Sequence, residues 1–229
     1  MSIADAYDLI VFDLDGTLVD SLDDIATSVH HAHAAVGLPP VGLDRVRAWV
    51  GHGAGRLIER TAGDGASPET VEAALGAFLA HHGEHCTERT APYPGVRRAI
   101  AVLNERGKPL AVLTNKPVAM TRKVLEAAGL LRCFREVVGG DSLVGARPVP
   151  RKPDPEGLLG LVRRLASTPP RTLLIGDTAV DVRTARNAGC ASAGVTYGFR
   201  PEEFGELPPD HVIGSLEDLI REPRRRDGS

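Results

Sequence analysis

The feature that most constrains this 229-residue chain is a pair of aspartates placed directly behind a short apolar run. The sequence LIVF at residues 9–12 predicts a buried strand, and DLDGT at residues 13–17 follows at its carboxyl end. Side chains alternate between the faces of a strand, so Asp13 and Asp15 point the same way, toward the edge where open α/β sheets bind ligands. Two carboxylates so close together repel each other unless a cation or a proton neutralises one. The segment therefore predicts a site that combines a nucleophile with a metal ion.

The turn after this strand also suits an anion. Gly16 allows a sharp turn, and Thr17 offers a hydroxyl beside backbone N–H groups, which together can hold a phosphate oxygen. A simpler explanation is that Asp and Gly follow strands because they form turns, and this segment alone leaves that alternative open. A calcium-binding EF-hand loop is excluded, because it needs glycine sixth and glutamate twelfth, whereas Gly16 is fourth here and Asp24 is twelfth.

Three further segments follow in order, each after or beside a predicted strand. LAVL at 110–113 leads into TNK at 114–116, RKPDP at 151–155 opens a helix, and LLI at 173–175 leads into GDTAVD at 176–181. Together with DLDGT, these segments resemble the four motifs of the haloacid dehalogenase-like (HAD) hydrolase superfamily, and the resemblance covers essentially the whole chain. It implies an α/β fold with a doubly wound parallel-sheet core and a small inserted helical cap. Dehalogenases of the superfamily lack the second aspartate of the first motif, so Asp15 disfavours that activity.

The resemblance also implies a role for each motif residue. A phosphate dianion within about 4 Å of the Asp13 carboxylate costs roughly 4 kcal/mol per charge pair at an effective dielectric constant of about 20, so positive charge has to be supplied. Lys152 supplies one charge, and Mg²⁺ suits an all-oxygen site. Asp13 attacks phosphorus and therefore needs a depressed pKa, while Asp15 carries the proton for the leaving group. The predicted catalytic residues are Asp13, Asp15, Thr114 and Lys152, and the predicted Mg²⁺ ligands are Asp13, Asp15 (through its backbone carbonyl), Asp177 and Asp181 (directly or through water).

Substrate selection is expected in the cap. WVGHGAGRLI at 49–58 is similar to the cap segment of bacterial phosphoglycolate phosphatases, as is GDS at 140–142. A dinucleotide-binding loop is excluded there, because Arg56 stands where the third glycine is required and no strand precedes it. The guanidinium of Arg56 suits a substrate carboxylate, although a solvated helix position is an equal alternative. The predicted substrate-binding residues are Thr17, Asn115, Arg56 and Gly53.

These residues predict an Mg²⁺-dependent phosphomonoester hydrolase that forms an aspartyl-phosphate, with 2-phosphoglycolate as the favoured substrate. A phosphatase for a sugar phosphate or pyrophosphate, or a phosphomutase, is the nearest alternative. A non-catalytic binding protein is disfavoured, because Asp13, Asp15, Lys152 and Asp177 are all present.

The pattern of apolar residues divides the chain into two units. Residues 19–91 form the predicted cap, because their pattern predicts helices and no strand. The predicted helices lie at 21–37, 43–50, 54–62 and 67–88. Residues 1–18 and 92–229 form the predicted core, with hinges near 19–20 and 91–94. Strands are expected at 110–113, 136–138, 172–175, 192–195 and 211–213, separated by helices at 96–106, 117–128, 155–165 and 179–188, with a loop at 139–150 and a last helix from Ser215.

The composition of the chain limits the kinds of partner and compartment that we expect for the protein. A net charge of −3 gives no argument for nucleic acid, and no apolar run is long enough for a membrane span. Cys86, Cys133 and Cys190 form no paired pattern, which predicts reduced thiols and a cytoplasmic protein. We expect a small phosphorylated metabolite as ligand and a monomer or homodimer. The histidines on the predicted helices are expected to face solvent: His30, His31, His33, His81, His82 and His85. The basic C-terminal tail is also expected to be solvated, and its arginines are Arg221, Arg224, Arg225 and Arg226.

Overall fold

The computed structural model describes residues 1–144 and 147–222 and is built around a six-stranded parallel sheet. The strand order is β10-β9-β8-β1-β4-β5, so β1 lies near the middle. All five strands expected after the first are present, and the apolar run at the N-terminus forms β1. The strands are β1 (Leu9–Phe12), β4 (Leu110–Leu113), β5 (Glu136–Val138), β8 (Thr172–Gly176), β9 (Ala191–Val195) and β10 (His211–Ile213).

The strand order places a ligand site between β1 and β8. From β1 the chain continues toward β4 on one side, and from β8 it continues toward β9 on the other. Phe12 pairs with Val112 of β4 and with Ile175 of β8, so the carboxyl ends of the three strands are level. Parallel sheets bind ligands at this kind of topological switch point. The residues after Phe12 and Ile175 are therefore brought together by the sheet itself.

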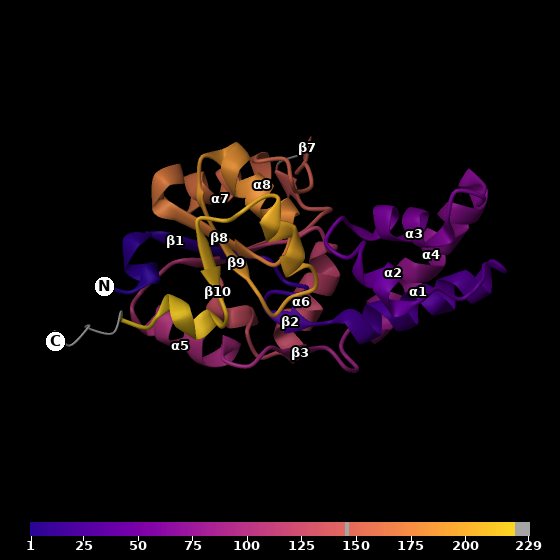
Figure 1. Ribbon diagram of the computed structural model, residues 1–229, viewed down its shortest axis with the longest axis horizontal. Coiled ribbons are helices and arrows are strands. Elements are labelled where there is room, and N and C mark those ends of the chain that lie inside the picture. The colour runs from indigo at the N-terminus through magenta and orange to yellow at the C-terminus, as the bar shows by residue number, and fades with distance from the viewer. Residues whose placement is uncertain (145–146, 223–229) are drawn as a thin grey trace.

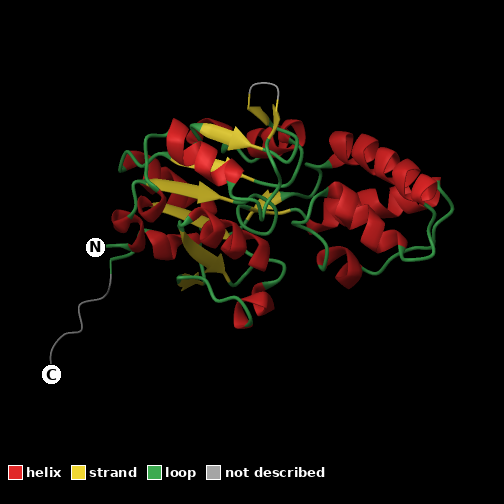
Figure 2. Ribbon diagram, turned by 90° about the horizontal axis from the view of Figure 1, so that it is seen from above, coloured by secondary structure: helices red, strands yellow, loops and turns green. Residues whose placement is uncertain are grey.

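Helices cover both faces of the sheet, as Figure 2 shows. Ile10 and Phe12 face one side, where they pack with α5 (Val96–Glu105) and α6 (Val118–Ala127). Leu9 and Val11 face the other, where α7 (Glu156–Arg164) and α8 (Ala179–Ala188) lie. All four side chains of β1 are fully buried, which explains why this strand is apolar at every position. The expected doubly wound α/β core is confirmed.

Four further helices form a separate group beside the carboxyl edge of the sheet (Figure 1). They are α1 (Leu22–Ala35), α2 (Leu43–Arg47), α3 (Ala54–Ala62) and α4 (Pro68–His85). Ser67 caps α4 by accepting a hydrogen bond from the Thr70 N–H (3.2 Å), with Pro68 at the first helical position. The group has its own apolar core, which Phe199 of the sheet unit joins. The chain thus carries the predicted helical insert.

The structure corrects several expected elements. The hinge segments pair with each other as a short antiparallel ribbon, β2 (Val19–Asp20) with β3 (Ala91–Pro92). The predicted loop at 139–150 contains a hairpin, β6 (Leu143–Val144) with β7 (Arg147–Pro148). These strands are too short to leave a periodic pattern in the sequence. The last helix is only a 3-10 turn, η5 (Leu216–Leu219); the other 3-10 turns are η1 (Ile3–Ala6), η2 (Leu131–Cys133), η3 (Pro169–Arg171) and η4 (Pro201–Gly205).

The remaining expectations from composition have mixed outcomes. All three cysteines lie in the described chain and are free, as expected. Over residues 1–144 and 147–222, the structure contains no helix with the length and apolar character of a membrane span. The expectation that the histidines face solvent is wrong for His33 and His82, which are each 2% exposed. Of the basic tail, Arg224, Arg225 and Arg226 lie outside the described residues.

Candidate active site

Three buried aspartates meet at the switch point of the sheet. Asp13 follows β1, Asp177 follows β8, and Asp181 lies in the first turn of α8. One carboxylate oxygen from each lies within 4.8 Å of the others. Their side chains are almost completely removed from solvent, at 2%, 0% and 2% exposure for Asp13, Asp177 and Asp181. The residues predicted as side-chain ligands of a metal ion are thus brought together.

Lys152 is the cation of this cluster. It is buried just before α7, and its Nζ lies 2.9 Å from Asp13 Oδ1 and 2.6 Å from Asp181 Oδ1. Burial lowers the pKa of the ammonium, but the neighbouring carboxylates of Asp13 and Asp181 outweigh it, so the pKa of Lys152 is raised and the side chain stays charged. The segment 151–155 therefore reaches the same edge of the sheet as Asp13, as the sequence predicts.

One lysine does not neutralise three carboxylates. Burial raises the pKa of Asp13 to about 6, even though Lys152 opposes the shift. Burial, together with the charges of Asp181 and Asp13, raises the pKa of Asp177 well above its usual range. The expected depressed pKa of Asp13 is therefore wrong for the protein alone, because desolvation exceeds the effect of the single lysine. The cluster carries an excess of negative charge.

These carboxylates fit a divalent metal ion. Asp13 Oδ1 is buried and accepts no hydrogen bond from the described residues, although it lies in an ion pair with Lys152 at 2.9 Å, and this leaves a lone pair free for a cation. The side-chain donors are all carboxylate oxygens, which favour hard cations such as Mg²⁺ and Ca²⁺. The backbone carbonyl of Asp15 as a further ligand stays a prediction.

Glycine at position 16 is required by this arrangement. Gly16 has φ +83°, and a Cβ there would lie 2.2 Å from Asp177 Oδ2. Asp177 is oriented by the N–H of Phe199 (2.8 Å) and by the hydroxyl of Thr17 (3.4 Å). Thr17, predicted to bind substrate, therefore contacts a predicted metal ligand.

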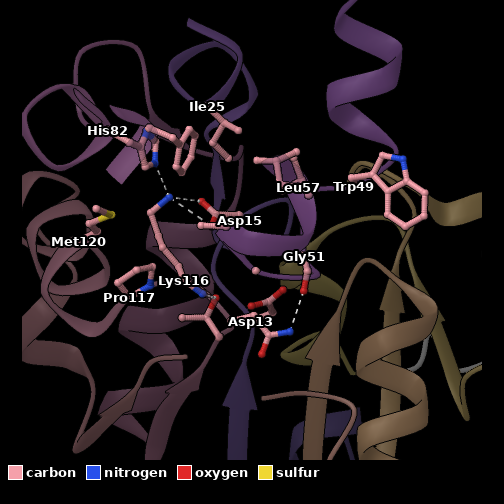
Figure 3. A pocket seen from close by; sticks show the side chains of 16 residues that line it. Asp13, Asp15, Ile25, Trp49, Gly51, Leu57, His82, Lys116, Pro117 and Met120 are labelled. Atoms are coloured by element: carbon pink, nitrogen blue, oxygen red, sulfur yellow. Dashed lines mark hydrogen bonds and ion pairs between the residues drawn. The ribbon is translucent and has the colours of Figure 1, made fainter. Parts of the chain in front are cut away.

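Asp15 faces a pocket between the sheet and the helical group. Its carboxylate accepts a hydrogen bond from Ser21 Oγ (2.6 Å) and lies 3.1 and 3.3 Å from Lys116 Nζ. The same Nζ lies 2.9 Å from His82 Nε2. Figure 3 shows the ammonium group of Lys116 between Asp15 and His82. The core side of the pocket is formed by Asp13, Asp15, Thr114, Asn115, Lys116, Pro117 and Met120, and the helical side by Ile25, Trp49, Val50, Gly51, Gly53, Ala54, Leu57, Phe78 and His82.

The two residues of the second motif have different surroundings. Thr114 is buried and lines the pocket. Asn115 donates to the carbonyls of Gly51 (2.8 Å) and Lys152 (3.1 Å), and its Oδ1 accepts from the Lys152 N–H (2.9 Å). Asn115 thus holds the segment that carries Lys152 and also contacts the helical group. Its predicted contact with a phosphoryl oxygen stays a prediction.

The two residues of the helical group that were predicted to bind substrate, Gly53 and Arg56, have different surroundings in the structure. Gly53 precedes α3 and lines the pocket. Arg56 lies outside the pocket lining, is half exposed, and forms an ion pair with Glu59 at 3.0 Å. This geometry favours the alternative that Arg56 is a solvated helix residue. The cation that does line the pocket, Lys116, belongs to the TNK segment, but no role was predicted for it.

Comparison with known proteins agrees with the geometry. A family model described as haloacid dehalogenase-like hydrolase matches residues 7–189. Phosphoglycolate phosphatase 1 of Pseudomonas aeruginosa is 39% identical over 221 residues, covering 93% of this chain and 78% of that protein. The phosphoglycolate phosphatase of Pasteurella multocida is 36% identical over 222 residues, covering 93% and 97% respectively. A crystal structure of a predicted phosphoglycolate phosphatase from Haemophilus somnus has a TM-score of 0.85 at 32% identity, covering 94% of this chain and 97% of that one.

The matched region contains the strand ends, the buried lysine and the aspartates that meet at the switch point. The resemblance carried by the four short motifs is therefore confirmed along most of the chain, in fold as well as in sequence. This protein belongs to the haloacid dehalogenase-like hydrolase family.

Proposed function

We propose that the protein catalyses the Mg²⁺-dependent hydrolysis of 2-phosphoglycolate to glycolate and phosphate. The observation that carries the proposal is the buried cluster of Asp13, Asp177, Asp181 and Lys152 at the end of β1, in which Asp13 lines a pocket that Asp15 also lines. A carboxylate-rich site of this kind suits a metal ion with a phosphate group. The names of the relatives support the choice of phosphoglycolate.

In this mechanism Asp13 is the nucleophile. Asp13, Asp177, Asp181 and the Asp15 backbone carbonyl would hold Mg²⁺, which supplies Lewis-acid polarisation and alignment of the phosphoryl group. Lys152 already lies 2.9 Å from Asp13 and reduces the repulsion between its carboxylate and the phosphate. Asp13 attacks phosphorus, the bond from phosphorus to the ester oxygen breaks, and an aspartyl-phosphate forms.

Asp15 acts as the general acid and then as the general base. It is buried at the pocket wall and held by Ser21 and Lys116, so its carboxyl group is oriented before substrate arrives. In its protonated form it donates to the ester oxygen as glycolate leaves. It then accepts a proton from the water that attacks phosphorus, which releases phosphate and restores the Asp13 carboxylate. Thr114 and Asn115 are proposed to bind the transferring phosphoryl oxygens.

The helical group excludes water from the site. We propose residues 19–91 as a mobile cap on the core of residues 1–18 and 92–229, with the β2–β3 ribbon as its base. In the described arrangement the cap touches the core on both sides of the pocket. Arg200 donates to the carbonyl of Val50 (3.1 Å), and Lys123 donates to the carbonyls of Gly83 and Glu84 at the end of α4 (2.8 and 2.7 Å). Such closure strengthens electrostatic interactions at the phosphoryl group.

The test is a panel of phosphate esters assayed with Mg²⁺, and again after removal of divalent ions with EDTA. The panel contains 2-phosphoglycolate, sugar phosphates, pyrophosphate and a simple alkyl phosphate. We expect the highest kcat/KM for 2-phosphoglycolate, loss of activity with EDTA, and recovery on adding Mg²⁺. A marked preference for a sugar phosphate or for pyrophosphate would overturn the choice of substrate.

A further inference from the structure

Lys116 is a buried cation that the proposed chemistry at phosphorus does not use as a ligand. Its side chain is 5% exposed, and it is the one residue with a full positive charge among the described residues that line the pocket. Lys152 is not available for a second anion, since Asp13 and Asp181 already engage it. A buried ammonium in a ligand pocket requires anionic partners.

His82 fixes the ammonium group of Lys116 from the cap. Ser28 Oγ donates its proton to the carbonyl of Asp24 (2.8 Å), so it accepts from His82 Nδ1, which lies 3.0 Å away. This assigns the proton of the neutral ring to Nδ1 and leaves Nε2 to accept from Lys116 Nζ at 2.9 Å. Burial and the charge of Lys116 lower the pKa of His82 to about 2, in agreement with a neutral ring. Stacking on Phe78, with ring centroids 5.1 Å apart, holds the imidazole in place.

These contacts do not use all the N–H donors of the Lys116 ammonium group. One N–H goes to His82, and one is shared between the two oxygens of Asp15, at 3.1 and 3.3 Å. An ammonium group has three N–H donors, so these described contacts leave one for a ligand.

The position of Lys116 matches the geometry of the substrate. Asp15 has to contact the ester oxygen to protonate it, and Lys116 Nζ is in hydrogen-bond contact with Asp15. In 2-phosphoglycolate the carboxylate is separated from that oxygen by a single methylene group. The substrate carboxylate therefore arrives beside Asp15, within reach of the Lys116 ammonium. The apolar wall formed by Ile25, Leu57 and Phe78 offers no competing charge.

We propose that Lys116, positioned by His82 of the cap, binds the carboxylate of the substrate and makes the enzyme selective for small phosphomonoesters that carry one. This inference rests on the proposed phosphatase activity and extends it to a specific carboxylate subsite. Because the lysine belongs to the core and the histidine to the cap, the subsite is complete only while the cap lies over the pocket.

The test compares two substrates of similar length, 2-phosphoglycolate and 2-hydroxyethyl phosphate, in which a hydroxymethyl group replaces the carboxylate. For the unmodified enzyme we expect kcat/KM to favour 2-phosphoglycolate by roughly 100-fold, a ratio in the range expected for a charged hydrogen bond. In Lys116→Met this ratio should fall close to one, because kcat/KM should fall much further for 2-phosphoglycolate than for 2-hydroxyethyl phosphate. Lys116→Arg should retain part of the ratio, and His82→Gln should reduce it by roughly 10-fold.

Three results would overturn the inference. Equal losses on both substrates in Lys116→Met would mean that the lysine only orients Asp15. An unchanged ratio in Lys116→Met, together with its loss in Arg56→Gln, would assign the carboxylate to Arg56 instead. An unmodified enzyme that cleaves both esters without preference would contradict the substrate proposal as well, so the two failures are distinguishable. Arg132→Gln, an exposed change in η2, serves as the matched control, and thermal unfolding of each variant verifies folding.

Discussion

The active site has two halves that differ in origin. The half proposed to bind the metal ion and the phosphoryl group consists of Asp13, Asp177, Asp181 and Lys152, which all come from the sheet unit. The half proposed to bind the rest of the substrate joins Lys116 of the core to His82 of the cap. If the proposals hold, the residues for the chemistry at phosphorus are positioned by the sheet topology, whereas selectivity depends on how the helical insert packs over the sheet. Changes in the first half should affect every substrate, and changes in the second should discriminate between substrates.

The largest effect is expected from Asp13→Asn. Removing the nucleophile should lower kcat by roughly 10⁴-fold or more, equally for 2-phosphoglycolate and for 2-hydroxyethyl phosphate. Steady-state kinetics with both esters measures this, with the exposed Asp64→Asn as a control for the loss of a carboxylate. Activity close to that of the unmodified enzyme would show that Asp13 is not the nucleophile.

The next effect concerns metal binding by Asp177. In Asp177→Asn we expect the apparent Mg²⁺ affinity to fall by roughly 100-fold, because a buried ligand with a negative charge is lost. The rise in unfolding temperature that Mg²⁺ causes in the unmodified protein should be strongly reduced at the same concentration. Calorimetric scans with increasing Mg²⁺ measure both. An identical Mg²⁺ response in the variant would place the ion elsewhere.

A third prediction concerns stability in the absence of metal. The pKa of Asp13 is raised from 3.8 to about 6 in the folded protein, so ionisation disfavours folding. The stability contributed by the protonated form is complete below pH 3.8 and is lost as the pH rises through 6. As the pH rises between those values, the free energy of unfolding of the metal-free protein should fall by on the order of 3 kcal/mol more than that of Asp13→Asn.

Urea unfolding of both proteins across this pH range, in EDTA, gives the difference directly. Comparing the two proteins cancels the contribution of carboxyl groups whose pKa values do not depend on Asp13, such as Asp8 and Asp210, both of which have lowered pKa values. Parallel pH profiles for the two proteins would contradict the electrostatic description of the cluster.

The smallest effect is expected from Arg200, a core residue that contacts the cap but does not itself line the pocket. Arg200 is buried, pairs with Glu203 (2.6 Å), and donates to the carbonyl of Val50 in the cap. Arg200→Gln should raise KM for both esters by roughly 10-fold, because it weakens closure for both. Their ratio should not change, because both esters react in the closed state, where His82 still contacts Lys116. A change in the ratio, or no change with either ester, would count against Arg200 as a contact that holds the cap. The exposed Arg132→Gln is again the control.

Much of the core site was predictable because each of its residues is tied to a regular element. Asp13 and Asp177 directly follow buried strands, and parallel strands align their carboxyl ends, so a sequence pattern is enough to bring them together. Asp181 belongs to the first turn of the helix after β8, which fixes its distance from Asp177. The sequence pattern did not reveal the balance of burial against charge, which is why the pKa of Asp13 was predicted in the wrong direction.

The cap side was predicted less well, because its contacts depend on tertiary packing. His82 belongs to a helix that carries several histidines, and nothing in the local sequence pattern distinguishes its role from that of its partly buried neighbour His81. Only the docking of α4 against the core brings its ring to Lys116. Arg56 was selected for its charge, but the helix directs it toward Glu59. The β2–β3 ribbon was missed because two residues per strand carry no periodicity.

The most direct test of the account is a crystal structure of the protein with Mg²⁺ and beryllofluoride, a mimic of a phosphoryl group attached to a carboxylate. We predict beryllium bonded to a carboxylate oxygen of Asp13, Mg²⁺ held between Asp13 and Asp177, and Lys152 Nζ in contact with a fluoride. Beryllofluoride bound elsewhere, or Mg²⁺ absent from the three aspartates, would contradict the central claim that these segments form one phosphoryl-transfer site.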